Sequence, residues 1–479
     1  MGGMVHKPMR VLALPGLAAG LVLLAAPAAP ALARTLTFPE ALQLTLGASP
    51  RLREAEAQTA AAAGAQSAAR GAGLPRLSLS ATGTRSDNPL TVLGERLSQR
   101  GATFADFGAD QFTGPGSLGV APEALNRPGG YNNFNTKLEV DVPLYTGGRT
   151  QAQSERAARL VEAARMGDAS ARQALTYDVL ATFEGLRTAR ARLQVAAASE
   201  KSAAALLDTA TRLFKQGAAL KSDELTAQVN LAQARLRRQA AADAEADTLE
   251  RLRVLTGLPD SEPIELGPPA APPMATGDAA QLVERALANN PDLRALEHQV
   301  EARGAGVEAA RAAYRPSFNL VLQHEWNDQH LGLSAPSDTI AGVLSWDVFD
   351  FGTRSGEVSR AQAEQQAARA RLAQARDELR LRIGQARRSA QLAAARVQVS
   401  KASVEDAAEA QRIVLLRYAQ GVATLTDTLA GQARLDEASD ALLNSEYQER
   451  LARAALLQAL GELDLQHVSA SARQGDLGQ

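Results

Sequence analysis

Cysteine is absent from the 479-residue chain, which excludes disulfides, thiolate metal sites, cysteine nucleophiles and a lipid anchor on an N-terminal cysteine. Aromatic residues are also scarce, at 4% of the chain, although hydrophobic residues make up 45%. The core must therefore be built mainly from alanine, leucine and valine. A formal charge of −2 gives no basic footprint for nucleic acid, so we expect no DNA or RNA partner.

Catalytic and metal-binding motifs are missing from the sequence as well. The five histidines do not cluster with acidic residues at ligand spacing on one helix. No glycine-rich phosphate loop and no nucleophile elbow occurs. His324 and His330, near the end of a predicted strand, leave only a weak metal site open. We therefore predict a protein that is not an enzyme and needs no cofactor.

The one long apolar run lies at the N-terminus. Lys7 and Arg10 precede an apolar stretch at 11–24, and the small residues Ala31 and Ala33 follow it. This order is typical of a secretory signal peptide, so we predict that residues 1–33 are cleaved and the protein leaves the cytoplasm. Beyond them, no stretch holds the roughly 18 uncharged apolar residues that a membrane-spanning helix needs.

The rest of the sequence is present twice. The stretch FKQGAALKSDELTAQ at 214–228 returns as YAQGVATLTDTLAGQ at 418–432, with its aromatic residue, Gln, Gly, Asp and Leu in the same places 204 positions later. Gly148 and Gly352 recur at the same offset. We predict two tandem repeats, at 34–256 and 278–463. A proline-rich linker at 257–277 joins them, and a polar C-terminal tail follows at 464–479.

Helical periodicity dominates each repeat. Between Gly148 and Lys215 there is no proline, and apolar or small residues recur at spacings of four and three, as they do again from Leu379 to Tyr418. This predicts long coiled-coil helices whose small seam residues let neighbours approach closely. Each helix would be about 100 Å long. A soluble coiled-coil rod would show the same seam, so the heptads alone do not decide the function.

Two shorter segments in each repeat alternate apolar with polar residues; they are 77–82, 134–144, 318–326 and 340–348. This period is typical of strands in an outer-membrane barrel, apolar toward lipid and polar toward the lumen, although a half-buried soluble sheet gives the same pattern. Four strands cannot close a barrel, and each unpaired backbone group at an open edge in lipid costs several kcal/mol. Subunits must then share one barrel, of about eight strands for two chains or twelve for three.

These motifs together resemble one known family. The LTFPEAL start, the NNPDL stretch of the second repeat, the PLYTGG segment between strand and helix, and the two QG breaks occur in the order found in TolC-like outer-membrane efflux channels. The resemblance covers nearly all of the predicted mature chain. It implies a mainly α protein with a membrane β-barrel part, in which a homotrimer forms a 12-stranded barrel and a periplasmic α-helical barrel.

The resemblance also implies the function and the location. The protein would be the exit duct of a tripartite efflux or type I secretion system in the outer membrane of a Gram-negative bacterium. It would conduct cargo passively from an inner-membrane pump and a periplasmic adaptor (membrane fusion) protein, and it would contact outer-membrane lipid. Two alternatives stay open from the residues alone: a periplasmic coiled-coil adaptor or scaffold without a pore, and an amphipathic peripheral lipid binder. The sequence does not name the cargo.

The two repeated breaks are expected at the periplasmic tip, because helices of about 100 Å separate them from the strands. Gly217 and Gly421 suit the left-handed residue that ends an incoming helix. Thr424 and Asp427 have the spacing of a capping box, and Asp223 lies in the first turn of the other outgoing helix. Helix capping accounts for both aspartates, and a functional role is compatible with it.

A pore gate at this tip is the functional hypothesis. In a trimer, Asp223 and Asp427 would form rings of negative charge that attract cations. The resemblance implies that a gate network includes Tyr418, Asp427, Asp223 and Ser222. Two positions depart from the family pattern, because Ala423 and Ala430 stand where a well-known member has an arginine and a second aspartate, so closure through that particular network is in doubt.

The tip is also the predicted docking site for the adaptor. The candidate contacts are the small and apolar residues of the two breaks: Gly217, Leu220, Leu225, Gly421, Val422 and Leu425. They serve equally well to hold the turns and to pack neighbouring helices. At the opposite end, the proline- and glycine-containing segment 87–130 is expected to be a long extracellular loop that narrows the outer mouth.

Overall fold

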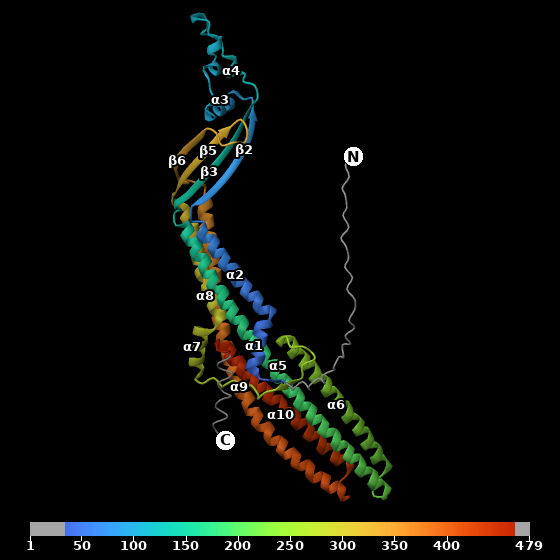
Figure 1. The fold of residues 1–479 in the computed structure, drawn as a ribbon. Coiled ribbons are helices and arrows are strands. Elements are labelled where there is room, and N and C mark those ends of the chain that lie inside the picture. The colour runs from blue at the N-terminus through green and yellow to red at the C-terminus, as the bar shows by residue number, and fades with distance from the viewer. Residues whose placement is uncertain (1–33, 465–479) are drawn as a thin grey trace, which may run out of the picture.

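The computed structural model describes residues 34–464. The predicted signal peptide at 1–33, and the tail from 465 onward, lie outside the described residues. The molecule is elongated, with a β-sheet toward one end and long helices running away from it (Figure 1). Among residues 34–464, no helix is both long and apolar enough to cross a membrane.

The four long helices repeat the same lengths in the two halves of the chain. Two of them have 67 residues each, α5 (Arg149–Lys215) and α9 (Thr353–Ala419), and two have 36 each, α6 (Lys221–Thr256) and α10 (Leu425–Leu460). At 1.5 Å per residue, α5 and α9 each span about 100 Å, as predicted. Near the strands α5 and α9 pack against α8, and toward the tip they pack against α6 and α10, respectively (Figure 1).

Shorter helix pairs begin each repeat. They are α1 (Phe38–Ala48) with α2 (Pro50–Gly71), and α7 (Ala279–Asn289) with α8 (Pro291–Arg311), which continues into the 3-10 turn η4 (Ala312–Tyr314). Ser49 and Asn290 cap the second helix of each pair, and a proline follows in its first turn, where no backbone N–H is needed. Each repeat thus opens with two helices that are separated by a capped break.

Repeated ion pairs join these helices to the long ones. Arg172 on α5 contacts Glu56 on α2 at 2.8 Å, and Arg376 on α9 contacts Glu297 on α8 at 2.8 Å. Both partners of the second pair occupy the positions that the repeat assigns to the first pair. The duplication thus extends from the sequence to individual contacts between helices.

The strands form one antiparallel sheet in the order β2 (Arg76–Ser86), β3 (Tyr131–Tyr145), β5 (Ser317–Asp328) and β6 (Pro336–Ser345). All four predicted strands are present, although β6 ends at Ser345 and so leaves out Trp346 and Val348, which the prediction 340–348 included. Leu77 pairs with Val140 in the first half, and the second half repeats this pair as Phe318 with Leu344. Within the described chain, the outer edges of β2 and β6 have no partner strand.

The largest hydrophobic cluster lies midway along the helices and includes the proline-rich linker. Phe183 on α5 is fully buried there, and β1 (Arg34–Leu36) pairs in parallel with β4 (Ile264–Leu266). The Ala270 amide donates to the buried Glu184 carboxylate at 2.7 Å. The linker is therefore a packed part of the fold that joins the two halves, which its composition did not predict.

Candidate functional site

The two repeated breaks lie together at the end of the helices farthest from the sheet (Figure 1). Tyr418 and Leu425, from the second break, share one hydrophobic cluster with Leu206 on α5 and Ala227 on α6. Segments about 200 residues apart in sequence therefore form a single tip. This is the arrangement that the duplicated sequence motif predicted.

Glycine ends the incoming helix in both breaks. Gly217 and Gly421 have φ angles of +75° and +73°, which a residue with a Cβ adopts only with strain. The next amides, of Ala218 and Val422, donate back to the carbonyls of Leu213 and Arg417, both at 2.9 Å. These bonds close the last turn of each helix as in a Schellman motif. The break thus reverses the chain within a few residues.

Each outgoing helix begins with an aspartate that caps it. The Thr424 hydroxyl and amide both donate to the Asp427 carboxylate, at 2.7 and 3.1 Å, which completes the predicted capping box. The Thr424 hydroxyl bond, the Thr424 amide bond and the nearby Arg417 charge lower the pKa of Asp427. In the other break, the Leu220 amide donates to Asp223 at 3.3 Å.

Tyr418 is buried at the tip with only 5% of its surface exposed. Its hydroxyl has no hydrogen-bond partner among residues 34–464. Burial, and then the negative charge of Asp223, raise the pKa of Tyr418. The structure therefore brings Tyr418 and Asp223 near each other, whereas Asp427 is engaged with Thr424 and Ser222 is exposed.

The predicted docking residues divide into two groups. Leu220, Leu225 and Val422 are exposed, and the space beside Gly217 and Gly421 is open. Leu425 differs, because it is only 5% exposed and packs inside the tip cluster. Its side chain is covered by its own chain and supports the turn from within.

Sequence reasoning missed one charged pair at the tip. Lys221 forms an ion pair with the buried carboxylate of Glu224 and lies over the ring of Phe214, 5.2 Å from its centre. The hydrogen bond from Lys221, opposed in part by desolvation, lowers the pKa of Glu224. The signal was the spacing of three residues between opposite charges on one helix. This pair ties the start of α6 to the end of α5.

At the other end of the molecule, the sheet has two unlike faces. One face presents mainly apolar side chains, among them Leu79, Leu138, Leu322 and Ile340. The height of this face can be judged from β6, where Pro336 lies opposite Trp326 and Trp346 follows the strand. From Pro336 to Trp346 the chain is about 34 Å long. With the tilt that strands have in a membrane barrel, this length spans about 25 Å along the membrane normal, which is the height of a lipid-facing apolar band.

The opposite face is polar and internally hydrogen-bonded. Asn135 donates to Glu325 at 3.1 Å, Gln323 donates to Glu139 at 2.8 Å, and Lys137 pairs with Glu139 at 2.8 Å. Such a face suits a water-filled lumen. His324 lies on the other, apolar face, because it pairs with Leu138, and its ring contacts the Asp338 carboxylate at 2.5 Å. Within residues 34–464, no group of three or more potential ligands gathers for a metal ion.

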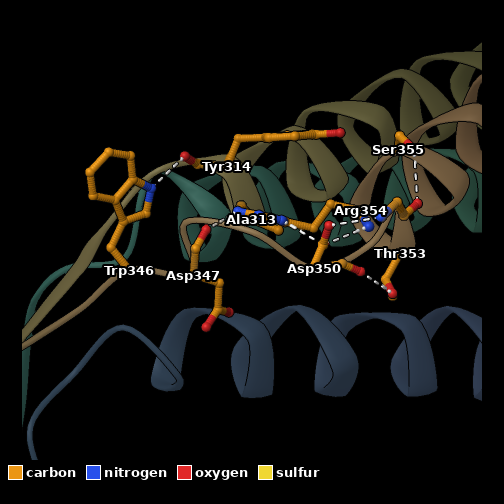
Figure 2. A network of polar contacts seen from close by, with 9 residues as sticks. Ala313, Tyr314, Trp346, Asp347, Asp350, Thr353, Arg354 and Ser355 are labelled. Atoms are coloured by element: carbon orange, nitrogen blue, oxygen red, sulfur yellow. Dashed lines mark hydrogen bonds and ion pairs between the residues drawn. The ribbon is translucent and has the colours of Figure 1, made fainter.

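A network of polar contacts holds the sheet on the helices (Figure 2). The Trp346 indole donates to the Tyr314 carbonyl at 3.2 Å, and Arg354 on α9 donates to the carboxylate of Asp350 at 2.7 Å. In the first repeat, two hydroxyls take the same positions, with Thr150 bonded to Thr146 at 2.9 Å. The direction in which the helices leave the sheet is thus fixed twice in each chain.

Comparisons with known proteins agree with this arrangement. The family model of the outer membrane efflux protein matches residues 41–258 and 282–462. CyaE of Bordetella pertussis is 30% identical over 326 residues, which cover 66% of this chain and 68% of CyaE. The outer membrane efflux protein BepC of Brucella suis is 24% identical over 333 residues, which cover 68% of this chain and 72% of BepC.

A solved structure shares the fold. The open state of the MtrE outer membrane channel of Neisseria gonorrhoeae matches with a TM-score of 0.71 at 20% identity, covering 89% of this chain and 89% of MtrE. The family match spans both repeats and includes the strands, the long helices and the breaks of this structure. The chain belongs to the outer membrane efflux protein family, whose members are transport channels rather than enzymes.

Proposed function

We propose that the protein is a homotrimeric exit duct, which receives cargo from an inner-membrane pump and a periplasmic adaptor and conducts it passively across the outer membrane. The observation that carries this proposal is the four-stranded sheet, with one apolar face and two unpaired edges, β2 and β6. In lipid, each unpaired backbone group costs several kcal/mol, so the edges require partners from other copies. Three copies supply the twelve strands that the family resemblance implies.

The internal repeat supplies the geometry of the contact between copies. Within the chain, the second strand of the first repeat pairs with the first strand of the second repeat, so that Val140 lies opposite Leu322. The equivalent strands at the two edges are β6 and β2. In the repeat, Val140 on β3 is equivalent to Leu344 on β6, as their in-chain partners Leu77 and Phe318 show. Leu322 on β5 is equivalent in the same way to Ala81 on β2. We infer that Leu344 of one copy lies opposite Ala81 of the next.

The tip is then the periplasmic entrance, where copies bring their breaks together. We propose that Tyr418, Asp223, Asp427 and Ser222 line the gate and that the exposed tip residues receive the adaptor. The Tyr418 hydroxyl, which is buried and has no hydrogen-bond partner within residues 34–464, supports a polar role for this residue at the entrance. Because Ala423 and Ala430 carry no polar group, closure here depends on the helix breaks more than on a network of ion pairs.

A periplasmic scaffold without a pore explains less of the structure. It requires long helix pairs but no sheet with an apolar face about 25 Å high. The exposed aliphatic side chains of that face, such as Leu79, Ile340 and Leu344, would lie in water. Exposed apolar patches of this kind indicate a membrane or protein contact.

Single-channel conductance in planar bilayers tests the proposal. The purified mature protein is compared with Asp223→Ala and Asp427→Ala, and we expect discrete, long-lived, cation-preferring steps. The cation preference should weaken in both variants, because each removes one ring of negative charge from the entrance. If the protein instead proves to be a monomer that carbonate extracts from the outer membrane and that carries no current, the exit-duct proposal is wrong.

A further inference from the structure

The segment between β2 and β3, which sequence analysis treated as a loop, contains helical structure. Its elements are α3 (Pro89–Ser98), the 3-10 turns η1 (Phe104–Phe107), η2 (Ala109–Gln111) and η3 (Pro115–Ser117), and α4 (Glu123–Asn126). Asn88 caps α3 and Pro89 occupies its first turn. The second repeat has no counterpart of this segment, because β5 and β6 are joined by residues 329–335 alone.

Helix α3 lies on the polar face of the sheet. The Thr84 hydroxyl on β2 donates to Glu95 on α3 at 2.8 Å. The Gln99 amide donates to the side-chain oxygen of Asn133 on β3, also at 2.8 Å. Thr84 and Asn133 are paired in the sheet, on the face opposite to Leu79 and Leu138. These contacts therefore place α3 on the lumen side of the strands.

Burial supports this placement. Asn133 is 9% exposed and Asn327 is 4% exposed, and they bond to each other at 3.1 Å, beneath the end of α3. On α3 itself, Val92 and Glu95 are buried. Gln99, the residue that follows the last turn of α3, continues this face, and the face packs on the sheet.

The segment reaches across the whole sheet. After α3, the Arg100 guanidinium donates to the Pro336 carbonyl on β6 at 2.7 Å, although α3 follows directly on β2 at the opposite edge. An ion pair between Arg96 and the buried Asp106 fixes the next turn of the segment. In a closed barrel the sheet curves around its polar face. A segment that bridges the first and last strands of the sheet on that face lies on the inner side of this curve.

The free face of α3 is apolar. Leu90, Gly94 and Leu97 follow one another at spacings of four and three on the side opposite to Val92 and Glu95. Leu90 is 83% exposed and Leu97 is 54% exposed, so more than half of each residue's surface is left uncovered by its own chain. This face points away from the sheet, so in a closed barrel it would face the lumen.

We propose that α3 forms a second constriction, at the outer mouth, in which Leu90 and Leu97 of every copy surround the pore. The inference rests on the exit-duct proposal, because it needs a closed barrel. An apolar ring inside a polar lumen hinders water and ions by dewetting. It would limit ion flow through an idle channel and set the size of the cargo that leaves.

Single-cysteine variants test this assignment, because the chain has no cysteine of its own. Leu90→Cys and Leu97→Cys are studied in planar bilayers, with a cationic, membrane-impermeant methanethiosulfonate added on the outer side. We expect stepwise reductions of the single-channel current, one for each modified copy. Leu79→Cys, on the lipid face, is the matched control and should show no change.

A second measurement covers a failure of the cysteine variants to fold. The double variant Leu90→Ala/Leu97→Ala should conduct more than the parent, because the ring becomes wider and less apolar. Unchanged current after modification that mass spectrometry confirms, or no modification of either cysteine, overturns the outer constriction. A parent protein that is monomeric, extracted by carbonate and without current instead overturns the exit-duct proposal, and the constriction with it.

Discussion

At the scale of single residues, the aspartates of the tip act first as helix caps. The Asp427 carboxylate accepts two bonds from Thr424, and its negative charge favours the N-terminus of α10. The folded tip therefore holds Asp427 ionised more firmly than an unfolded chain does, which is why its pKa is lowered. A substitution that removes the Asp427 side chain abolishes both its charge and its hydrogen bonds, so it cannot separate their contributions to the stability of the tip.

The lowered pKa of Asp427 gives a pH prediction. A carboxyl whose pKa is lower when folded stabilises the fold above its unfolded pKa of about 3.9, and this contribution is lost as pH falls through the folded value. We expect amide protection at 422–427, corrected for intrinsic exchange rates, to be constant between about pH 7 and 5 and to fall below about pH 4. Asp427→Asn, which lacks the charge throughout, is the control. Loss of protection already near pH 6 would contradict this assignment.

At the scale of secondary-structure elements, the edges of the sheet give a prediction about register. Leu344→Cys combined with Ala81→Cys should form a disulfide between copies, because the internal repeat places these residues opposite each other across the edge. The product is read as a covalent ladder of dimers and trimers on a denaturing gel that reductant abolishes.

Register-shifted pairs provide the control for this experiment. Ala81→Cys with Gly342→Cys or with Trp346→Cys keeps both cysteines on the same face but moves them by two residues. These pairs should cross-link much less, since cysteines bridge only when their Cα atoms lie within about 7 Å. Equal cross-linking of all three pairs, or a preference for a shifted pair, would show that the copies do not repeat the internal contact.

The elements also show what the sequence could predict. The four strands and the long helices were visible because period-two and heptad patterns persist over many residues. The strand β1 and its partner β4 have only three residues each, too few for a period. Helix α3 was hidden inside a segment rich in proline and glycine, although Asn88 and Pro89 formed a recognisable helix start.

The candidate site was predictable in its chemistry but not in its burial. The glycine turns and the capping box at Thr424 follow from residue type and spacing. That Leu425 points into the tip while Val422 is exposed depends on how two distant breaks pack together. The residue types within one break do not reveal that contact, so the predicted docking residues could not be separated from those that support the turn from within.

At the scale of the whole molecule, docking and assembly should be separable. Gly421→Glu strains the left-handed residue and places a charge in open space at the tip, far from the sheet. We expect export in cells to be lost while trimers in the outer membrane persist. Gly356→Glu, a helical glycine with open space around it near the sheet, is the matched control and should export normally. Normal export by Gly421→Glu would refute docking at this position.

The equal lengths of α5 and α9 have a consequence for how such a molecule can change its span. The two helices start at equivalent joints and end in breaks that share one hydrophobic cluster. Deleting one heptad from a single helix would displace its break by about 10 Å relative to the other. Leu206 and Tyr418 would then lose contact, and the tip would be skewed. The length of the duct can therefore change only if α5 and α9 change by the same number of residues. The two halves that arose by duplication are thus constrained to keep equal helix lengths.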